Sequence, residues 1–333
     1  MPHAVLVTSI GAKVPLLEAV RDALRRLHPT GRLIGADSDD RVVGRWFVDG
    51  FWPMPPLDEL APSMLAEFCR RHAVGWIVPT RDAELPVLAT WAAQQRDQLP
   101  PVLAPPREAA ELCLDKLRFA EELGELAAVP AWLSPPPELP ACFPEDRWVV
   151  KERFGAGSRR LTLDVSREEA VRAGHTFEAP IFQPFIRGVE YSADLYISRV
   201  GEAWGCVVRR RDLVRDGESQ VTTIVRRPGI EELVLEAARR LGLRGCAVFQ
   251  VLEDRHGGLH LLECNPRFGG ASTLSLAAGL DVFYWFFRET TEPGFRPGNF
   301  VRGRPGLRLV RYKRDRILEP ERAAPAATEE NRS

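Results

Sequence analysis

Apolar runs of strand length alternate with helix-like segments over the first hundred residues, and this alternation is the strongest constraint on the fold. The expected strands are AVLVTSIG (4–11), RLIGADS (32–38), GWIVPT (75–80) and PVLAP (101–105). The segments between them place apolar residues at helical spacing, as in VPLLEAVRDALRRL, MLAEFCRRHAV and DAELPVLATWAAQQRDQ. Strands that alternate with helices predict a parallel, doubly wound α/β sheet. Such sheets bind ligands beyond the carboxyl ends of their strands, where we expect Thr80, Asp82 and Glu84.

The pattern changes from residue 147. Before it, the segment REAAELCLDKLRFAEEL (107–123) leads into the proline-rich connector LSPPPELPACFPED (133–146). Beyond it, strand-like runs separated by turn signals are interrupted by one clear helix, IEELVLEAARRLGL (230–243). This pattern predicts a second, largely antiparallel α+β region. The polar end ERAAPAATEENRS (321–333) is expected to be disordered.

Charge and composition argue against several classes of protein. The formal net charge of the 333 residues is −1, so no overall field attracts nucleic acid or an anionic membrane. No apolar run approaches the roughly 20 residues that cross a bilayer, and the N-terminus lacks the basic segment of a signal peptide. Six scattered cysteines without a CxxC motif indicate the reducing cytoplasm, and the histidine spacing does not suit zinc.

Two apolar runs near the C-terminal end are expected to form a β-hairpin. CAVFQVL and LHLLE are separated by EDRHGG, whose glycines suit a tight turn. Centring that turn between His256 and Gly257 pairs Gln250 with Glu263 across the hairpin. An amide and a carboxylate would then lie side by side on one face of the sheet.

An acid, an amide and a guanidinium alternate where the second of these runs ends, at Glu263, Asn265 and Arg267. Alternate residues of an extended chain share a face, so these three would join Gln250. Mg²⁺ takes oxygen ligands, often one or two carboxylates together with substrate phosphates. Since only one of the three oxygen donors is anionic, such a site would depend on phosphates, which Arg267 would also face. The alternative is an Asn-Pro turn with solvated charges.

A glycine-rich segment follows another strand-like run in RWVVKERFGAGSRR (147–160). The strand would deliver Lys151, and the glycines would let successive backbone N–H groups approach a phosphate. The alternative is a hairpin with a polar tip. In IFQPFIRGVEY (181–191), the Gln183 amide suits the edge of a base and Glu190 suits ribose hydroxyls; the alternative is an ordinary strand–turn–strand.

The order of these elements resembles the ATP-grasp enzymes, of the type closest to the large subunit of carbamoyl-phosphate synthase and its small carboxylate–amine ligase relatives. The resemblance extends over residues 1–312. It implies an N-terminal α/β lobe at 1–105, a small ATP-grasp lobe at 106–182 and a larger C-terminal lobe at 183–320, before a tail at 321–333. ATP would be held between the two ATP-grasp lobes.

The resemblance also implies a role for each matching residue. Nucleotide binding is implied for Lys116 of LDKLRF, for Lys151, for the loop residues Gly155, Ala156, Gly157 and Ser158, and for Gln183, Phe185, Ile186 and Glu190. The resemblance implies that Gln250, Glu263 and Asn265 bind Mg²⁺, with Mn²⁺ as an alternative. Arg267 matches the catalytic arginine, and RRRDLVRDGES (209–219) matches a segment in which Arg209 and Arg211 would hold a carboxylate or phosphate.

The implied activity is that of an ADP-forming ligase that joins a carboxylic acid to an amine, such as an amino acid or peptide, through an acyl phosphate. Two alternatives stay open: phosphorylation or carboxylation with bicarbonate or carbamate, as in carbamoyl-phosphate synthase, and a nucleotide-binding regulatory protein. The expected partners are small-molecule substrates, and the resemblance is compatible with a homodimer.

Overall fold

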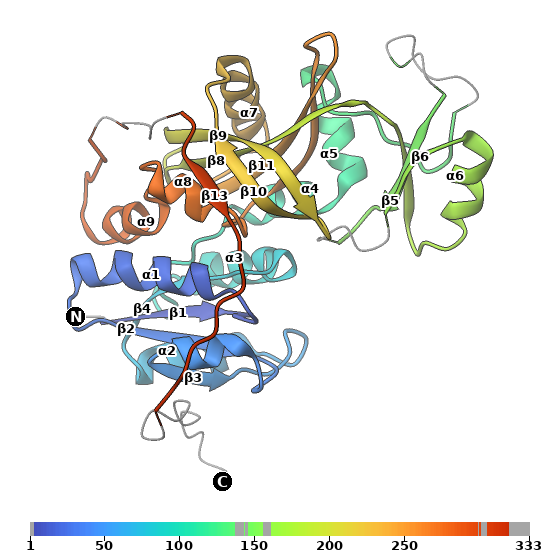
Figure 1. Ribbon diagram of the computed structural model, residues 1–333. Helices are drawn as coiled ribbons and strands as arrows, with labels where there is room; N and C mark the ends of the chain where they lie inside the picture. Colours follow the sequence, from blue (N-terminus) through green and yellow to red (C-terminus); the bar gives the residue numbers. More distant parts are fainter. Residues whose placement is uncertain are drawn as a thin grey trace.

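The computed structural model describes residues 3–136, 143, 146–155, 161–298, 300 and 305–319. These residues form three β-sheets, of four, six and three strands, with helices packed against each (Figure 1). No helix within these ranges combines the length and the hydropathy needed to span a lipid bilayer.

The four-stranded sheet is parallel and doubly wound, as predicted. Its order is β3-β2-β1-β4, with the bounds β1 Ala4–Thr8, β2 Arg32–Asp37, β3 Gly50–Pro53 and β4 Val74–Val78. Helix α1 (Val14–Leu27) covers one face, where Val5 and Val7 point. Helices α2 (Pro62–Arg71) and α3 (Leu85–Gln94) cover the other, where Leu6 points. Short 3₁₀ turns lie at η1 Val43–Phe47 and η2 Asp82–Glu84.

One predicted strand in the first half of the chain was wrong, and one strand was missed. The expected strand at 101–105 makes only an isolated bridge, between Val102 and Ile77, because the prolines around it have no N–H to donate. Strand β3 was not predicted. Segment 107–123 forms two helices, α4 (Arg107–Leu114) and α5 (Lys116–Glu122), because Asp115 is extended and its carboxylate caps α5. A 3₁₀ turn, η3 (Gly124–Leu126), follows.

The six-stranded sheet has the order β12-β11-β8-β9-β10-β13 and is antiparallel throughout. Its strands are β8 Gly188–Ile197, β9 Ala203–Arg215, β10 Glu218–Ile224, β11 Gly245–Asp254, β12 Leu259–Asn265 and β13 Arg308–Val310. Helix α7 (Pro228–Arg240) and helices α4 and α5 bury one face, against residues such as Phe249 and Leu261. The expected domain division assigns α4 and α5 to the small lobe, but the apolar side chains of these helices pack on the six-stranded sheet. The division itself stays a prediction.

The three-stranded sheet, β6-β5-β7, forms a separate small lobe with α6, at the right of Figure 1. The bounds are β5 Trp148–Glu152, β6 Leu161–Val165, α6 Arg167–Gly174 and β7 Pro180–Pro184. Trp148, Val150, Ala170 and Phe182 make its core. Ser166 and Glu169 form a capping box that fixes the start of α6.

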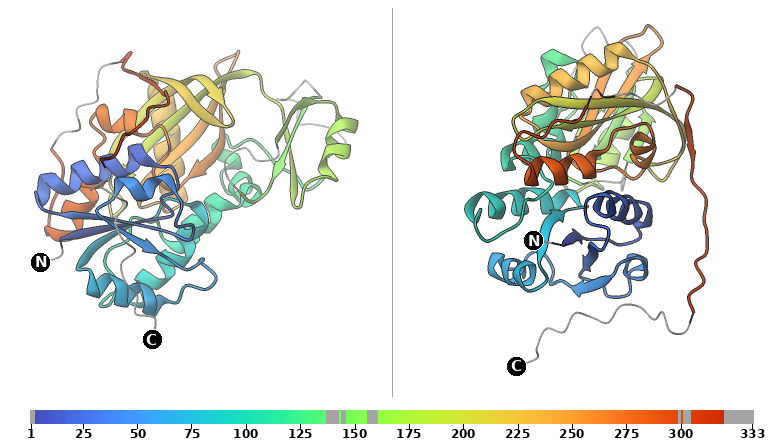
Figure 2. Two further views of the ribbon diagram at one scale, coloured as in Figure 1. Left: turned by 60° about the horizontal axis from the view of Figure 1, so that its bottom comes forward. Right: turned by 90° about the vertical axis from the view of Figure 1, so that its left-hand side faces the viewer.

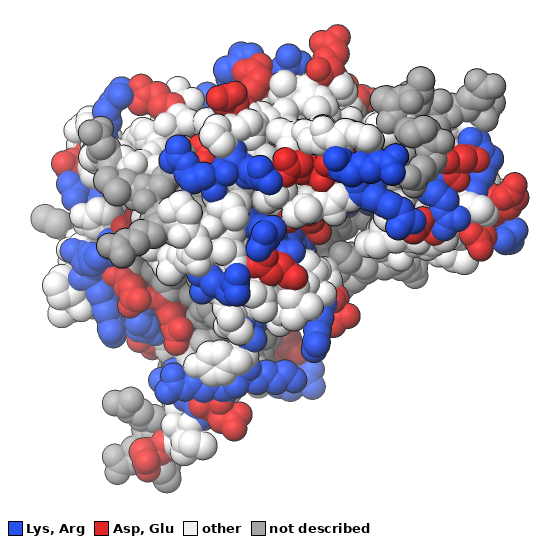
Figure 3. All heavy atoms as spheres, turned by 45° about the horizontal axis from the view of Figure 1, so that its top comes forward, with Lys and Arg blue, Asp and Glu red and all other residues white. Residues whose placement is uncertain are grey.

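The C-terminal part returns to the N-terminal sheet. Helices α8 (Thr273–Ala277) and α9 (Val282–Thr291) share one apolar core with α1, and Phe283 and Phe287 are fully buried there. After β13 the chain runs extended along the N-terminal domain (Figure 2), where Arg316 lies 4.5 Å above the Phe47 ring. Basic and acidic side chains are interspersed on the face in Figure 3, in keeping with a net charge of −1.

Candidate active site

One face of the six-stranded sheet carries all three proposed metal ligands and the two predicted arginines. Glu263 on β12 pairs with Gln250 on β11, Gln250 with Ser192 on β8, and Ser192 with Arg209 on β9. Asn265 lies two residues from Glu263 and therefore shares its face. The opposite face is the one that α4, α5 and α7 bury. The polar row is thus held by a sheet whose other side is a packed core.

The predicted pairing of Gln250 with Glu263 is confirmed, although the turn is not centred as expected. The register shifts after Gln250, so that Val251 pairs with Leu261. This irregularity places one extra residue in β12 and moves the centre of the turn by half a residue. Gly257 has a φ of +83°, a conformation that favours glycine.

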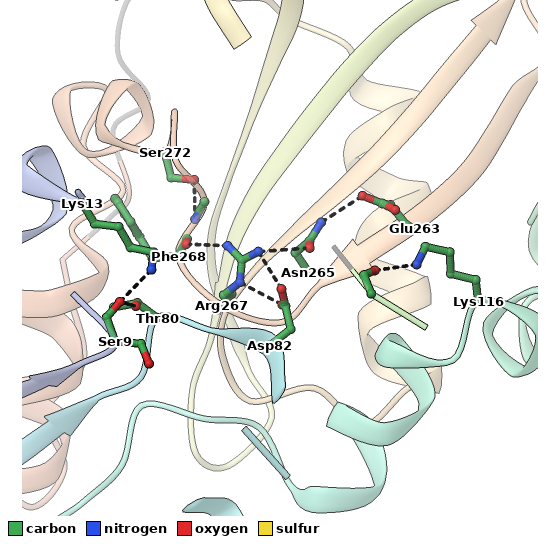
Figure 4. Close-up of polar contacts among 12 residues, drawn as sticks. Ser9, Lys13, Thr80, Asp82, Lys116, Glu263, Asn265, Arg267, Phe268 and Ser272 are labelled. Atoms are coloured by element: carbon green, nitrogen blue, oxygen red, sulfur yellow. Dashed lines mark hydrogen bonds and ion pairs between the residues drawn. The ribbon is translucent and has the colours of Figure 1, made fainter. Parts of the chain in front are cut away.

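The segment that ends β12 forms a continuous chain of polar contacts (Figure 4). The Asn265 side-chain nitrogen donates to Glu263 over 3.2 Å, and Arg267 donates to the Asn265 oxygen over 3.4 Å. Arg267 also binds both carboxylate oxygens of Asp82, at 2.8 and 2.7 Å. Asp82 follows β4 of the N-terminal sheet, so this bidentate ion pair joins the two halves of the molecule.

Two lysines lie near the acid of this row. Lys116 begins α5, and its amine donates to the Gly155 carbonyl over 2.6 Å. Desolvation lowers the pKa of Lys116, while Glu263 opposes that shift. Desolvation lowers the pKa of Lys151 on β5 to about 8; Glu263 again opposes the shift and Lys116 adds to it. The structure therefore brings both predicted lysines to Glu263. Ala156, Gly157 and Ser158 lie outside the described residues.

The predicted hinge lies between β7 and β8. Gln183 is buried, and its side-chain nitrogen donates to the Val129 carbonyl over 2.9 Å. Phe185 and Ile186 are half-buried in the segment that follows. Desolvation raises the pKa of Glu190, and the Arg211 guanidinium, with which it forms an ion pair, opposes that shift. Of these residues, Glu190 lies on the face of the polar row.

The two predicted anion-binding arginines have different surroundings in the structure. Arg209 is 3% exposed and donates to Asp194 over 2.6 Å, so its guanidinium is enclosed in an ion pair. Arg211 donates to Glu190, to the Ser219 hydroxyl over 3.1 Å and to the Gly217 carbonyl over 2.7 Å. Arg211 itself is 5% exposed, but its partner Glu190 is about one-third exposed, whereas Asp194, the partner of Arg209, is 3% exposed.

This difference predicts unequal effects on stability. Arg209→Met should lower the free energy of unfolding by about 3–5 kcal/mol, because it leaves Asp194 buried without its partner. Arg211→Met should cost about 1–2 kcal/mol, because water can solvate Glu190. Urea unfolding followed by circular dichroism checks this, and equal losses for the two variants would contradict the buried role of Arg209.

Sequence inspection did not identify the partners of these residues. Asp82 was expected at the carboxyl end of its strand but not as the partner of Arg267. Lys13, which donates to the Ser9 carbonyl over 2.7 Å, was not singled out; desolvation lowers its pKa, and nearby Arg267 adds to the shift. Asp194 gave no signal, because only the pairing of β8 with β9 brings it to Arg209.

The donor set suits a divalent ion bound together with an anionic ligand. The described residues contain no cluster of three or more His, Cys, Asp or Glu side chains that could hold a metal by themselves. Gln250, Glu263 and Asn265 instead offer one carboxylate and two amide oxygens from adjacent strand positions. Such a set fits Mg²⁺ if phosphate oxygens complete the coordination, and the two neighbouring lysines suit the same phosphates.

Comparisons with known proteins show the same architecture. Residues 176–314 match a protein family described as ATP-grasp in the biosynthetic pathway with Ter operon. A search of curated proteins gave no match.

Three solved structures illustrate the likeness in fold. The biotin carboxylase domain of 2-oxoglutarate carboxylase from Hydrogenobacter thermophilus, with MgADP, ADP and bicarbonate, has a TM-score of 0.69 at 17% identity, covering 90% of this chain and 72% of that one. L-amino acid ligase from Bacillus licheniformis has a TM-score of 0.68 at 16% identity, covering 91% of this chain and 77% of that one. N5-carboxyaminoimidazole synthetase from Staphylococcus aureus with ADP has a TM-score of 0.65 at 13% identity, covering 92% of this chain and 80% of that one.

Proposed function

This chain has the ATP-grasp fold, and we propose that it is an ATP-dependent ligase that joins a carboxylic acid to an amine, releasing ADP and phosphate. The observation that carries the proposal is the polar row on the six-stranded sheet, in which Gln250 pairs with Glu263 beside Lys116 and Lys151. The fold is shared with an L-amino acid ligase and with carboxylases, so the residues rather than the fold must argue for the chemistry.

The difficulty in this reaction is bringing a carboxylate to a triphosphate, since both are anions. Gln250, Glu263 and Asn265 would hold Mg²⁺, which supplies charge neutralisation at the phosphate oxygens when bound. Lys116 and Lys151 add two positive charges that interact with Glu263. Their lowered pKa values reflect desolvation, and a bound polyphosphate would favour their charged forms.

The acid substrate attacks the γ-phosphorus of ATP, which forms an acyl phosphate and releases ADP; the amine then displaces phosphate from the acyl carbon. Arg267 would stabilise the charge on the transferring group; its direct contact with Asn265, a proposed metal ligand, supports this role. Glu190 would take the ribose hydroxyls, and Gln183, Phe185 and Ile186 the base. Arg211 is the better candidate for an anionic substrate, because its ion-pair partner Glu190 is 31% exposed, whereas Asp194, the partner of Arg209, is 3% exposed.

The substrates would bind where the N-terminal sheet faces Arg267. Asp82 follows β4 there, and Glu84 accepts a hydrogen bond from Thr8 over 2.9 Å at the end of β1. Open α/β sheets bind ligands at these strand ends. Asp82 forms an ion pair with the Arg267 guanidinium in this structure, so an incoming acid would compete with Asp82 for Arg267.

A screen of substrates tests the proposal. ADP release is measured for pairs of amino acids and for bicarbonate, and products are identified by mass spectrometry. We expect release that requires both an acid and an amine, and a product mass equal to their sum less water. Release with bicarbonate alone would instead support carboxylation, and tight ATP binding without turnover on any pair would support a regulatory protein.

The pKa of Lys151 predicts a pH dependence of ATP binding. Above pH 8 the free protein progressively loses the Lys151 proton, so the Kd for ATP should rise by up to about tenfold per pH unit. Isothermal titration from pH 7 to pH 9.5 measures this. In Lys151→Met the binding of ATP should be weaker, and the rise of the Kd above pH 8 should be smaller, because the titrating Lys151 amine is absent. Some rise should remain, because Lys116 is present in both proteins. An equal rise in both would contradict the assignment.

A further inference from the structure

A buried acid, Asp194, organises the segment that carries Arg267. Asp194 lies on β8 and is 2% exposed. It accepts hydrogen bonds from Arg209 over 2.6 Å, from the Ser275 hydroxyl over 2.7 Å and from the Ser272 hydroxyl. A buried carboxylate is tolerated only with such compensation. Three donors from two different parts of the chain meet on it.

The two serines come from the segment directly after Arg267. Ser272 precedes α8 and Ser275 lies within it, and both are at most 2% exposed. The Ser272 hydroxyl also accepts from the backbone N–H of Gly269 over 3.1 Å, a contact drawn in Figure 4. A Cβ on Gly269 would lie 2.7 Å from that hydroxyl and 3.0 Å from Val248, so the segment is packed closely on the sheet.

Asp194 adjoins the candidate active site without entering the ion pair between Arg267 and Asp82. Val248 pairs with Asp194 on one side and with Asn265 on the other, so Asp194 and Asn265 lie in one row across three strands. Asp194, Ser272 and Arg267 line the same small cavity. Ring contact between Phe268 and Phe283, at 4.7 Å, holds the segment from its other side.

We infer that Asp194 is a positioning residue: through Ser272 and Ser275 it fixes segment 267–275 on the sheet and thereby sets the place of the Arg267 guanidinium. Arg209 in this arrangement neutralises Asp194 and does not bind substrate. The effect on turnover rests on the proposed function, whereas the effect on the segment does not.

Ser275→Ala tests the inference, because it removes one hydrogen bond and leaves the Asp194–Arg209 ion pair intact. We expect turnover of ATP to fall by about 3–10-fold, because the variant loses part of the stabilisation that a hydrogen bond to a charged group gives. The KM for ATP should stay unchanged within twofold. In an Arg267→Lys background the same change should cost less than twofold, because the misplaced guanidinium is already absent. Equal losses in the two backgrounds, or none in the wild-type background, would overturn the inference.

Hydrogen exchange supplies a readout that needs no catalysis. In the nucleotide-free protein, Ser275→Ala should speed exchange of the Gly269 and Leu276 amides by about tenfold, because both bond to Ser272. Ser198→Ala is the matched control: Ser198, directly after β8, is also fully buried, and its hydroxyl accepts from the Glu202 amide. It should leave both amides and turnover unchanged within twofold. Unchanged exchange in Ser275→Ala would overturn the inference, even if the wild type turned over no substrate and the proposed function had failed.

Discussion

Replacing Glu263 with glutamine is expected to lower the turnover of ATP by about 10²–10³-fold, the effect of removing one preorganised electrostatic group. Glu263 is the only anion among the three proposed metal ligands, and both lysines respond to its charge. Glutamine keeps the volume and one oxygen, so the loss isolates the charge. The measurement is ADP release under saturating ATP with increasing Mg²⁺.

Glu253→Gln is the matched control, since Glu253 lies on the same hairpin but on the opposite face of β11, where it accepts from Tyr191 over 2.9 Å. We expect its turnover to stay within about threefold of the wild type, because no proposed ligand is altered. A Glu263→Gln protein with near-normal turnover would remove Glu263 from the proposed metal site.

Replacing Arg267 with methionine should lower turnover by a similar factor of about 10²–10³, because the guanidinium would stabilise charge on the transferring phosphoryl group. The change also leaves Asp82 without its bidentate partner, and the expected loss of stability is about 1–3 kcal/mol. A single variant would therefore mix two effects.

The double variant Arg267→Met, Asp82→Asn separates them. Removing both charges should restore most of the unfolding free energy, while turnover stays as low as in Arg267→Met. Thermal unfolding and ADP release are measured on the same preparations. If turnover recovered together with stability, the role of Arg267 would be to join the domains and not to assist phosphoryl transfer.

Much of the fold could be predicted because its signals are local. The helical spacing of 14–27 and the apolar runs at 4–11 and 32–38 each specify one element, and their alternation specifies the sheet. The error at 101–105 arose where a short-range property was decisive, because prolines removed the backbone donors of that segment.

The candidate site was predictable in part. The pairing of Gln250 with Glu263 was predicted from the length of a regular hairpin, and it holds because an extra residue in β12 offsets the shifted centre of the turn. The contact between Asp82 and Arg267 joins residues 185 positions apart and leaves no local pattern. Arg209 and Arg211 look equivalent in the sequence, but the neighbouring strand offers Asp194 to one and Glu190 to the other. Their separate roles therefore depend on strand pairing that a sequence pattern does not reveal.

The central claim is that Gln250, Glu263 and Asn265 bind a divalent ion together with the phosphates of ATP. Crystals grown with Mn²⁺ and a non-hydrolysable ATP analogue test it directly, because anomalous scattering locates the manganese. We predict a peak within coordination distance of the Glu263 carboxylate and the two amide oxygens, next to the analogue's phosphates. Manganese on the phosphates alone, with no contact to any of these three side chains, would contradict the claim.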